Sequence, residues 1–151
     1  MLRLSKKLLF AIEAVLDIAY NAGTGPVQSG DITGRQGIPR RYLEQVLQQL
    51  VRAGILAGVR GPKGGYRLAR ERRRITVGEI VRVVRAIDGG EDPLEDDGGA
   101  ELGRRVVRPL WAELQDEVMK RLDAVTIEEL CTRAHNAGIS GEYAARLDFS
   151  I

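Results

Sequence analysis

The sequence of 151 residues predicts a mainly α-helical protein that carries one small β-hairpin and a long helix in its second half. Three observations support this prediction. Apolar residues recur every three or four positions along several segments, which indicates helices with one buried face. A glycine-rich stretch, Arg60 to Tyr66, separates two short runs that suit strands. From residue 105 onward the apolar positions alternate between intervals of three and four, as in a helix that packs against another helix.

The first predicted helix covers residues 5–21. Its apolar residues, at positions 8, 9, 12, 15, 16, 19 and 20, have the spacing of one buried stripe. Asn21, Ala22 and Gly23 end the helix, and we expect Gly23 in the left-handed conformation that often caps a helix. Pro26 and Val27 can then supply a short edge strand.

Two further helices and the hairpin follow. Residues 29–36 form a weak helix that Gly34 loosens, and Gly37 makes the turn after it. Pro39 fits the first turn of a third helix, which continues until residues 53–54. The buried stripe of this helix contains Tyr42, Leu43, Val46, Leu47 and Leu50. Because two short strands, 55–60 and 65–69, come next, the order of elements predicts a winged helix-turn-helix domain over residues 1–75.

A fourth helix is expected after the hairpin. Thr76 and Glu79 match a capping box, which places the helix from Thr76 to Ile87. Residues 88–103 are polar and rich in glycine and carboxylates, so we expect a loop there.

The long helix is expected over residues 105–125, and its apolar seam is the candidate dimerisation surface. The residues predicted to form it are Val107, Leu110, Trp111, Leu114, Val118 and Leu122. Trp111 also suits a core position or the wall of an effector pocket. A second capping box at 126–129 opens a short helix that ends at Gly138, and residues 138–151 are expected to be a loosely attached C-terminal tail. Residues 76–137 are thus predicted to be a helical dimerisation and sensing region.

The charge of the chain is unevenly distributed. Residues 1–75 contain 14 lysines and arginines against 5 acidic residues, whereas residues 76–151 contain 9 against 16. The formal net charge of +2 therefore hides a basic first half and an acidic second half. A basic half on an otherwise balanced chain is typical of nucleic-acid binding, because clustered cations are attracted to the phosphate backbone.

Composition excludes several classes of protein. The single cysteine, Cys131, allows neither an intrachain disulfide nor a metal site built from several thiolates. With one histidine and no recognisable catalytic arrangement, an enzyme is not expected. No apolar run reaches the roughly 20 residues that span a bilayer, and no targeting segment is recognisable, so we expect a cytoplasmic protein without membrane contact.

Residues 39–49 are the predicted recognition helix, because groove contacts concentrate in the first two turns of such a helix. The candidates for DNA contact there are Arg40, Arg41, Tyr42, Glu44 and Gln45. The arginines can bind guanine or phosphate, Gln45 can pair with adenine, and Glu44 can accept from cytosine or repel wrong bases. Tyr42 is equally suited to a buried supporting role. The alternative for the whole face is a solvated helix surface.

The glycine-rich tip is the predicted wing of the domain. Its candidate DNA contacts are Arg60, Gly61, Pro62, Lys63, Gly64 and Gly65. Glycine lets the backbone approach a polyanion closely, while the two basic residues supply charge for the minor groove. The alternative is a surface hairpin without a ligand. At the start of the first helix, Arg3, Ser5 and Lys7 can contact phosphate through charge and free N–H groups.

Two charged segments have open interpretations. The basic run of Arg70, Arg72, Arg73 and Arg74 either adds attraction for phosphate or is a solvated connector. The acidic residues of loop 88–103 suit a divalent cation, but such loops are more often unstructured.

A set of short motifs in a fixed order extends from residue 1 to about residue 135. The segments are 3–5, 10–12, 16–19, 32, 36–38, 42–45, 59–62, 64–66, 76, 78–79, 110–111, 126–127 and 129–130. Together they resemble the winged-helix regulators typified by the bacterial iron–sulfur cluster regulator, the nitrite-sensitive repressor and the cysteine-metabolism repressor. The resemblance implies a homodimeric transcription regulator that binds double-stranded DNA at a near-palindromic operator and acts as a repressor.

The chain departs from this family in one respect. Members that bind a cluster place three cysteines between the fourth and fifth helices, and residues 88–111 contain none. Carboxylates are hard ligands and guanidinium is no ligand, so neither the cluster nor another cofactor is expected. The signal could instead be a regulatory protein, a small-molecule effector or oxidation of Cys131. The alternative function is an interaction module that regulates a metabolic enzyme by protein–protein association.

Overall fold

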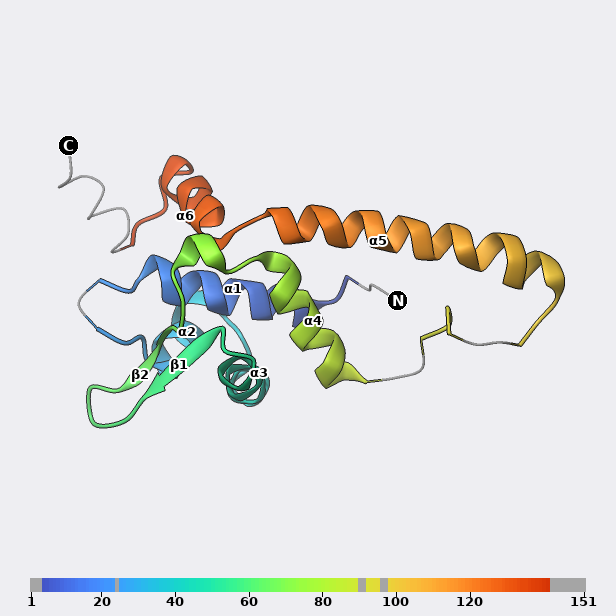
Figure 1. Ribbon diagram of the computed structural model, residues 1–151. Helices are drawn as coiled ribbons and strands as arrows, with labels where there is room; N and C mark the ends of the chain where they lie inside the picture. The colour runs from blue at the N-terminus through green and yellow to red at the C-terminus, as the bar shows by residue number, and fades with distance from the viewer. Residues whose placement is uncertain (1–3, 24, 90–91, 96–97, 142–151) are drawn as a thin grey trace.

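The computed structural model describes residues 4–23, 25–89, 92–95 and 98–141. In chain order these form α1 (Lys6–Tyr20), α2 (Ser29–Gln36), α3 (Arg40–Arg52), β1 (Leu56–Val59), β2 (Gly65–Leu68), η1 (Arg72–Arg74), α4 (Val77–Asp88), η2 (Gly103–Val107), α5 (Arg108–Ala124) and α6 (Ile127–Asn136). Figure 1 shows α3 and the hairpin at one side of the molecule, whereas α5 lies at the opposite side and extends far beyond the body. The mainly α-helical winged fold predicted from the sequence is confirmed.

Helix α1 runs through the centre of the body. The Ser5 hydroxyl caps its start by accepting from the Leu8 N–H at 3.2 Å. Its end differs from the prediction, because Gly23 does not adopt a left-handed conformation. Asn21 ends the helix instead, and both its backbone N–H and its side-chain amide donate to the Asp17 carbonyl at 3.0 Å. A side chain that caps in this way removes the need for a glycine.

The helix-turn-helix follows the prediction closely. Helix α2 covers the expected residues and ends at Gly37, whose φ of 65° makes the turn toward α3. Pro39 directly precedes α3, and Ala53 ends it. Every large apolar residue of its predicted stripe except Tyr42 is fully enclosed: Leu43, Val46, Leu47 and Leu50.

The hairpin pairs β1 with β2 in an antiparallel register that joins Leu56 to Leu68 and Val59 to Gly65. Val27 adds the predicted edge segment as a single bridge to Tyr66, with N–H to carbonyl distances of 2.8 Å in both directions. The close approach explains one glycine, because a Cβ at Gly65 would lie 2.4 Å from the Val27 carbonyl oxygen.

Helix α4 begins with the predicted capping box. The Thr76 hydroxyl accepts from the Glu79 N–H at 3.3 Å, and the Glu79 carboxylate accepts from the Thr76 N–H at 3.0 Å. Its buried residues join those of α1, α3 and α6 in one hydrophobic cluster, so the packing is continuous across residue 75. The division of the chain at that position remains a prediction about function.

A π-helical turn, η2, leads into α5, which starts close to the predicted residue. The Arg108 N–H donates to the Gly103 carbonyl, and Pro109, which has no N–H, follows directly. At its other end α5 packs tightly on α4, because Gly78 leaves room for Asp123 and the Arg82 guanidinium binds both carboxylate oxygens of Asp123 at 2.7 and 2.8 Å.

Helix α6 ends at the predicted position, and Gly138 follows with a φ of 77°. The predicted tail is not loose in its first residues. The Tyr20 hydroxyl donates to the Ile139 carbonyl, and Gly141 lies against the Tyr20 ring. Residues 142–151 of the predicted tail lie outside the described residues. Among the described helices, none is both long and apolar enough to cross a membrane.

Candidate nucleic-acid interface

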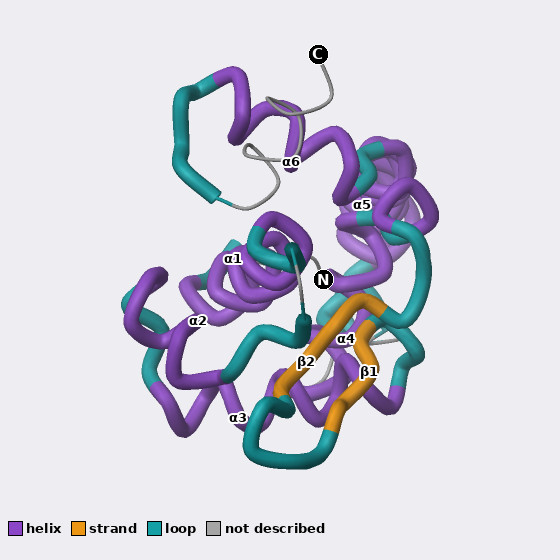
Figure 2. Tube along the Cα trace, turned by 90° about the vertical axis from the view of Figure 1, so that its left-hand side faces the viewer, coloured by secondary structure: helices purple, strands orange, loops and turns teal. Residues whose placement is uncertain are grey.

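The predicted recognition helix and wing lie together at one end of the molecule. Helix α3 contacts β1 directly, and Figure 1 shows α3 and the hairpin on the same side of the molecule, with the loop between β1 and β2 extending away from α3. Figure 2 shows the two strands of this hairpin, in orange, in a view turned by 90°. Helices α5 and α6 lie at the other end. The two elements predicted to contact DNA therefore lie on the same side of the molecule.

The outer face of α3 is polar and exposed. Arg40 and Glu44 form an ion pair one turn apart at 3.2 Å, and both side chains are mostly exposed. Arg41 and Gln45 are exposed and make no hydrogen bond or ion pair with the described part of the chain. These four predicted contact residues thus share a surface on which two are paired with each other and two are available.

Tyr42 supports α3 from within the fold. Its hydroxyl donates to the Lys7 carbonyl of α1 at 2.6 Å, and its ring lies 6.2 Å from the Phe10 ring. Burial and the nearby Asp88 carboxylate raise the pKa of Tyr42 to about 12. The hydroxyl is therefore neutral and engaged at physiological pH, so of the two roles that the sequence left open, the supporting one matches the geometry.

The wing residues divide into an exposed group and an enclosed group. Arg60, Gly61, Pro62 and Lys63 are exposed at the tip, whereas Gly64 is buried and Gly65 is half-buried. A Cβ at Gly64 would lie 2.2 Å from the Val59 carbonyl oxygen, so this glycine is needed for the tight turn. Gly64 and Gly65 shape the wing, and the exposed residues are the ones that a ligand can reach.

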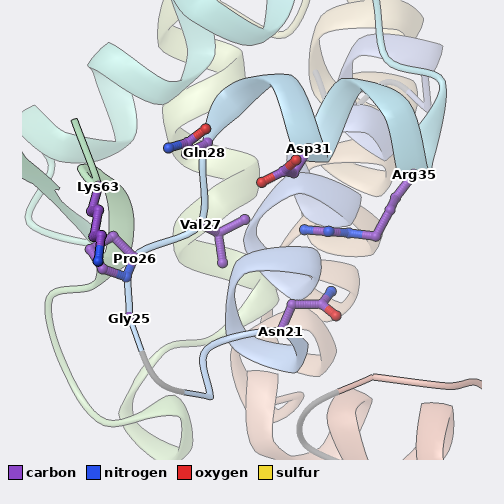
Figure 3. A pocket seen from close by; sticks show the side chains of 8 residues that line it. All are labelled: Asn21, Gly25, Pro26, Val27, Gln28, Asp31, Arg35 and Lys63. Carbon is purple, nitrogen blue, oxygen red and sulfur yellow. The ribbon is translucent and has the colours of Figure 1, made fainter.

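Gln28 is a wing partner that the sequence did not reveal. Its side-chain amide donates to the Pro62 carbonyl at 3.4 Å, which connects the start of α2 to the wing tip. Figure 3 shows Gln28 and Lys63 on the wall of an open, polar pocket between the wing, residues 21–28 and α2, with a volume of about 570 Å³. No pattern in the sequence indicates this contact, because it depends on how the wing folds back.

The predicted contacts at the start of α1 have separate outcomes. Arg3 lies outside the described residues. The Ser5 hydroxyl is occupied by the helix cap. The Lys7 ammonium lies 3.6 Å from the Asp88 carboxylate and 6.0 Å from the centre of the Tyr42 ring, and its side chain is 60% exposed. Lys7 can still turn toward a phosphate.

Three arginines of the basic run after the wing form ion pairs within the fold. Arg70 pairs with Glu79 at 3.0 Å and donates to the Gly54 carbonyl. Arg72 pairs with Glu128 of α6, and Arg73 with its neighbour Glu71. Arg70 and Arg72 thus attach the segment after the hairpin to α4 and α6, which favours the connector interpretation for these two residues.

The predicted dimerisation seam is largely uncovered. Five of its residues are between 40% and 53% exposed: Val107, Leu110, Trp111, Leu114 and Val118. Trp111 is therefore not a core residue. The sixth, Leu122, differs because it packs against the chain's own core at the base of α5. Leu102, directly before the π-helical turn, and Val106, within it, extend the exposed apolar surface.

The residues of the predicted sensing region do not fit an iron–sulfur cluster. Residues 88–111 contain neither cysteine nor histidine, and no group of three or more metal-binding side chains occurs in the described residues. Cys131 is fully buried in α6, and burial raises the pKa of its thiol, although the neighbouring Arg72 acts in the opposite direction. A buried, protonated thiol is a poor metal ligand.

The acidic loop is only partly described. Asp92 accepts from the Leu94 N–H at 2.9 Å, which lowers the pKa of its carboxyl group, and Glu101 pairs with Arg105 at 3.6 Å. Glu91, Asp96 and Asp97, which the cation hypothesis also needs, lie outside the described residues. Cation binding by this loop remains a hypothesis.

Comparison with known proteins agrees with the geometry. The model of the Rrf2 family, described as an iron-dependent transcriptional regulator, matches residues 4–133. The HTH-type transcriptional regulator IscR of Enterobacter sp. (strain 638) is 38% identical over 143 residues, which cover 93% of this chain and 86% of that protein.

Solved structures lead to the same family. T. potens IscR has a TM-score of 0.73 at 34% identity, covering 95% of this chain and 96% of that chain. CymR, the global cysteine regulator of B. subtilis, has a TM-score of 0.69 at 32% identity, covering 88% of this chain and 98% of that chain. The chain therefore belongs to the Rrf2 family and is a DNA-binding transcription regulator rather than an enzyme.

Proposed function

We propose that two copies of this chain bind a near-palindromic operator in the bacterial cytoplasm and repress transcription. Each copy places the start of α3 in a major groove, with the grooves about 34 to 36 Å apart, and its wing in the adjacent minor groove. The observation that carries the proposal is the arrangement of two surfaces. The polar, cationic residues of α3 and the wing lie on one side of the molecule, and α5, whose apolar seam is uncovered, lies on the other.

The DNA face is supported by the distribution of available charge. Arg41, Arg60 and Lys63 have no ion-pair partner in the described residues, whereas Arg70, Arg72 and Arg73 after the wing are paired. Unpaired surface cations can exchange condensed counterions for phosphate without first breaking an internal contact. The cationic face is therefore ready to bind a polyanion.

Specificity is assigned to three side chains of α3. Arg41 is available to bind guanine, Gln45 is available to pair with adenine, and Glu44 holds Arg40 until a base replaces it. The exposed wing tip, with Arg60 and Lys63, supplies sequence-independent attraction in the minor groove. The wing thus contributes affinity, and α3 contributes discrimination between bases.

Homodimerisation is supported by the apolar face of α5. A long helix that extends from the body with exposed leucine, valine and tryptophan is unfavourable in water unless a second surface covers it. Its seam of intervals of three and four matches the packing of two helices against each other. A second copy presents the same seam, so a symmetric pair covers both.

The sensing mechanism is proposed to be independent of an iron–sulfur cluster. The family is described as iron-dependent, but this chain lacks cysteine and histidine in the loop before α5. A regulatory protein or a small-molecule effector is the proposed signal, since the buried thiol of Cys131 is poorly suited to oxidation. Anaerobically purified protein should be colourless, and its native mass should match two polypeptides without a bound cluster.

The alternative, an interaction module that acts only on a metabolic enzyme, is not favoured by the family. A direct test is the affinity for duplex DNA of unselected sequence as a function of salt. The logarithm of the binding constant should fall steeply and linearly with the logarithm of salt concentration, by about 0.9 for each phosphate neutralised. An affinity that does not change with salt would refute the proposed interface.

Two wing variants sharpen this test. Arg60→Ala and Lys63→Ala should each make the slope shallower, by about 0.9 for every phosphate that the variant no longer neutralises. Arg73→Ala removes the same charge from the connector, where Arg73 is paired with Glu71, and should leave the slope unchanged. Equal effects of all three variants would show that net charge, rather than the wing, attracts DNA.

A further inference from the structure

Asp17 is the one charged residue that is buried in the described part of the chain, and its side chain is completely enclosed. The carboxylate accepts hydrogen bonds from three donors. Arg35 binds it in a bidentate manner, with Nε at 2.9 Å and Nη2 at 2.8 Å from the two oxygens. The Gln36 side-chain amide donates to it at 2.8 Å. Nothing in the proposed DNA contacts uses this cluster.

The position of the cluster connects α1 to the turn before the recognition helix. Arg35 and Gln36 are the last residues of α2, Gly37 makes the left-handed turn, and α3 starts at Arg40. Figure 3 shows the Arg35 side chain leaving α2 and reaching back toward α1. The carboxylate therefore holds the end of α2 directly before the chain enters α3.

Helix α3 has a second polar attachment to α1. The Tyr42 hydroxyl in its first turn donates to the Lys7 carbonyl at 2.6 Å. After Tyr42, the next apolar residues of α3, Leu43, Val46 and Leu47, are fully buried. Apolar packing is not directional, whereas a bidentate guanidinium–carboxylate pair fixes angle as well as distance. One polar contact at the end of α2, directly before α3, and one in the first turn of α3 can thus define the direction of α3 relative to α1.

The choice of a charged group at this position needs a reason other than stability. A buried ion pair is often no more stabilising than apolar residues of similar volume, although removing one partner is costly. Directional hydrogen bonds can instead select one arrangement of packed elements. We propose that Asp17 is a positioning residue that orients the recognition helix for base readout. This inference rests on the proposed DNA-binding function.

The test separates orientation of α3 from attraction to DNA. Two duplexes serve as probes: one enriched by the wild-type protein from a random-sequence pool, and one of unselected sequence. Asp17→Asn should weaken binding to the enriched duplex roughly tenfold to a hundredfold, comparable to losing one bidentate base contact. Binding to the unselected duplex should change less than about twofold, because the phosphate-contacting cations remain. The ratio of the two affinities is the decisive readout.

Asp31→Asn is the matched control. Asp31 is an exposed carboxylate of α2, so its replacement removes the same charge without touching the cluster. The control should leave the ratio at the wild-type value. If Asp17→Asn does not fold, Arg35→Lys replaces it, because lysine keeps the charge but cannot bind a carboxylate through two donors. A folded variant of either kind with an unchanged ratio overturns the inference.

A measurement without DNA distinguishes this inference from the proposed function. Residual dipolar couplings of the backbone amides report the direction of α3 relative to α1 in the free protein. The direction should change in Asp17→Asn and stay constant in Asp31→Asn. An unchanged direction overturns the positioning role even if DNA binding is confirmed, whereas a wild-type protein that binds neither duplex overturns the proposed function and the inference together.

Discussion

Helices α3 and α5 are both amphipathic, but only the apolar face of α3 is covered by other parts of the same chain. The large apolar residues of α3 from Leu43 to Leu50 are fully buried, so only its polar face is exposed. No residue of α5 is buried, and Trp111 at the middle of its seam is 53% exposed. Helix α3, whose apolar face is covered, exposes a polar face that can bind a ligand. Helix α5, whose apolar face is uncovered, exposes a surface that can bind another protein.

The largest effect is expected when the apolar seam of α5 is truncated. Trp111→Ala combined with Leu114→Ala should dissociate the proposed dimer, because four truncated side chains per dimer cost roughly 4–8 kcal/mol of association free energy. Each 1.4 kcal/mol is about tenfold in the dissociation constant, so the dissociation constant should rise by about three orders of magnitude or more. Sedimentation equilibrium at several protein concentrations measures it.

The opposite face of α5 provides the control. Asp116→Ala combined with Lys120→Ala also introduces two alanines, preserves net charge and changes exposed polar residues away from the seam. This variant should dimerise like the wild type. A wild-type protein that is monomeric at all concentrations would show that a second copy does not cover the seam of α5. Two variants that weaken association equally would show that association does not depend on the seam.

Variants of the wing test whether the hairpin is packed as tightly against the rest of the chain as the apolar face of α3 is. Gly65→Ala should lower the free energy of unfolding by about 2–3 kcal/mol, since the new Cβ meets the Val27 carbonyl and the φ of 151° is unfavourable for alanine. Gly58→Ala, in the facing strand with open space around it, should leave the free energy of unfolding unchanged or raise it by up to about 1 kcal/mol. Urea unfolding of both variants measures the difference.

Equal, small losses for the two glycine variants would mean that the wing can move away from Val27. The hairpin would then be a flexible attachment rather than part of the completed fold, and its tip would have no fixed position relative to α3.

Local patterns predicted the helices, the hairpin and the exposed seam, because these depend on side-chain spacing over a few residues. The capping pair Thr76 and Glu79 placed the start of α4 correctly for this reason. What could not be predicted depends on contacts between distant segments. The Gly23 prediction was wrong because Asn21 caps α1 through Asp17, a detail of side-chain geometry. The cluster of Asp17 with Arg35 gave no signal, since its members are separated in sequence and each is common on helix surfaces.

A smaller effect is expected where α3 contacts α1. Tyr42→Phe removes the hydrogen bond to the Lys7 carbonyl and should cost about 1 kcal/mol at pH 8. The cost should shrink between pH 10 and 12, because the folded pKa of about 12 exceeds the unfolded value of about 10. In that range the unfolded tyrosine ionises while the folded one stays neutral, so the wild type loses stability that the phenylalanine variant cannot lose.

Chemical denaturation of both proteins across this pH range gives the comparison, and titration of other groups cancels in the difference. A cost that stays constant up to pH 12 would show that the folded hydroxyl ionises as easily as an unfolded one. The hydroxyl of Tyr42 would then be more exposed than its supporting role requires, and this result would favour the predicted phosphate contact.

The smallest effect is expected at the base of α5, where Arg82 binds Asp123 on the surface. Asp123→Asn should lower stability by about 0.2–1 kcal/mol at pH 7, since both side chains are exposed to screening by water. The hydrogen bond from Arg82 lowers the pKa of Asp123 below its unfolded value of about 3.9, so this contribution is complete above that pH and disappears as the pH falls through the folded pKa. Asp116→Asn, elsewhere on α5, removes the same charge at an exposed position without an ion-pair partner in the described residues, and should leave the stability at pH 7 nearly unchanged. A loss well above 1 kcal/mol would mean that the ion pair, rather than the close packing at Gly78, fixes α5 to α4. The helix with the uncovered apolar face would then be held to the body of the fold mainly by charge.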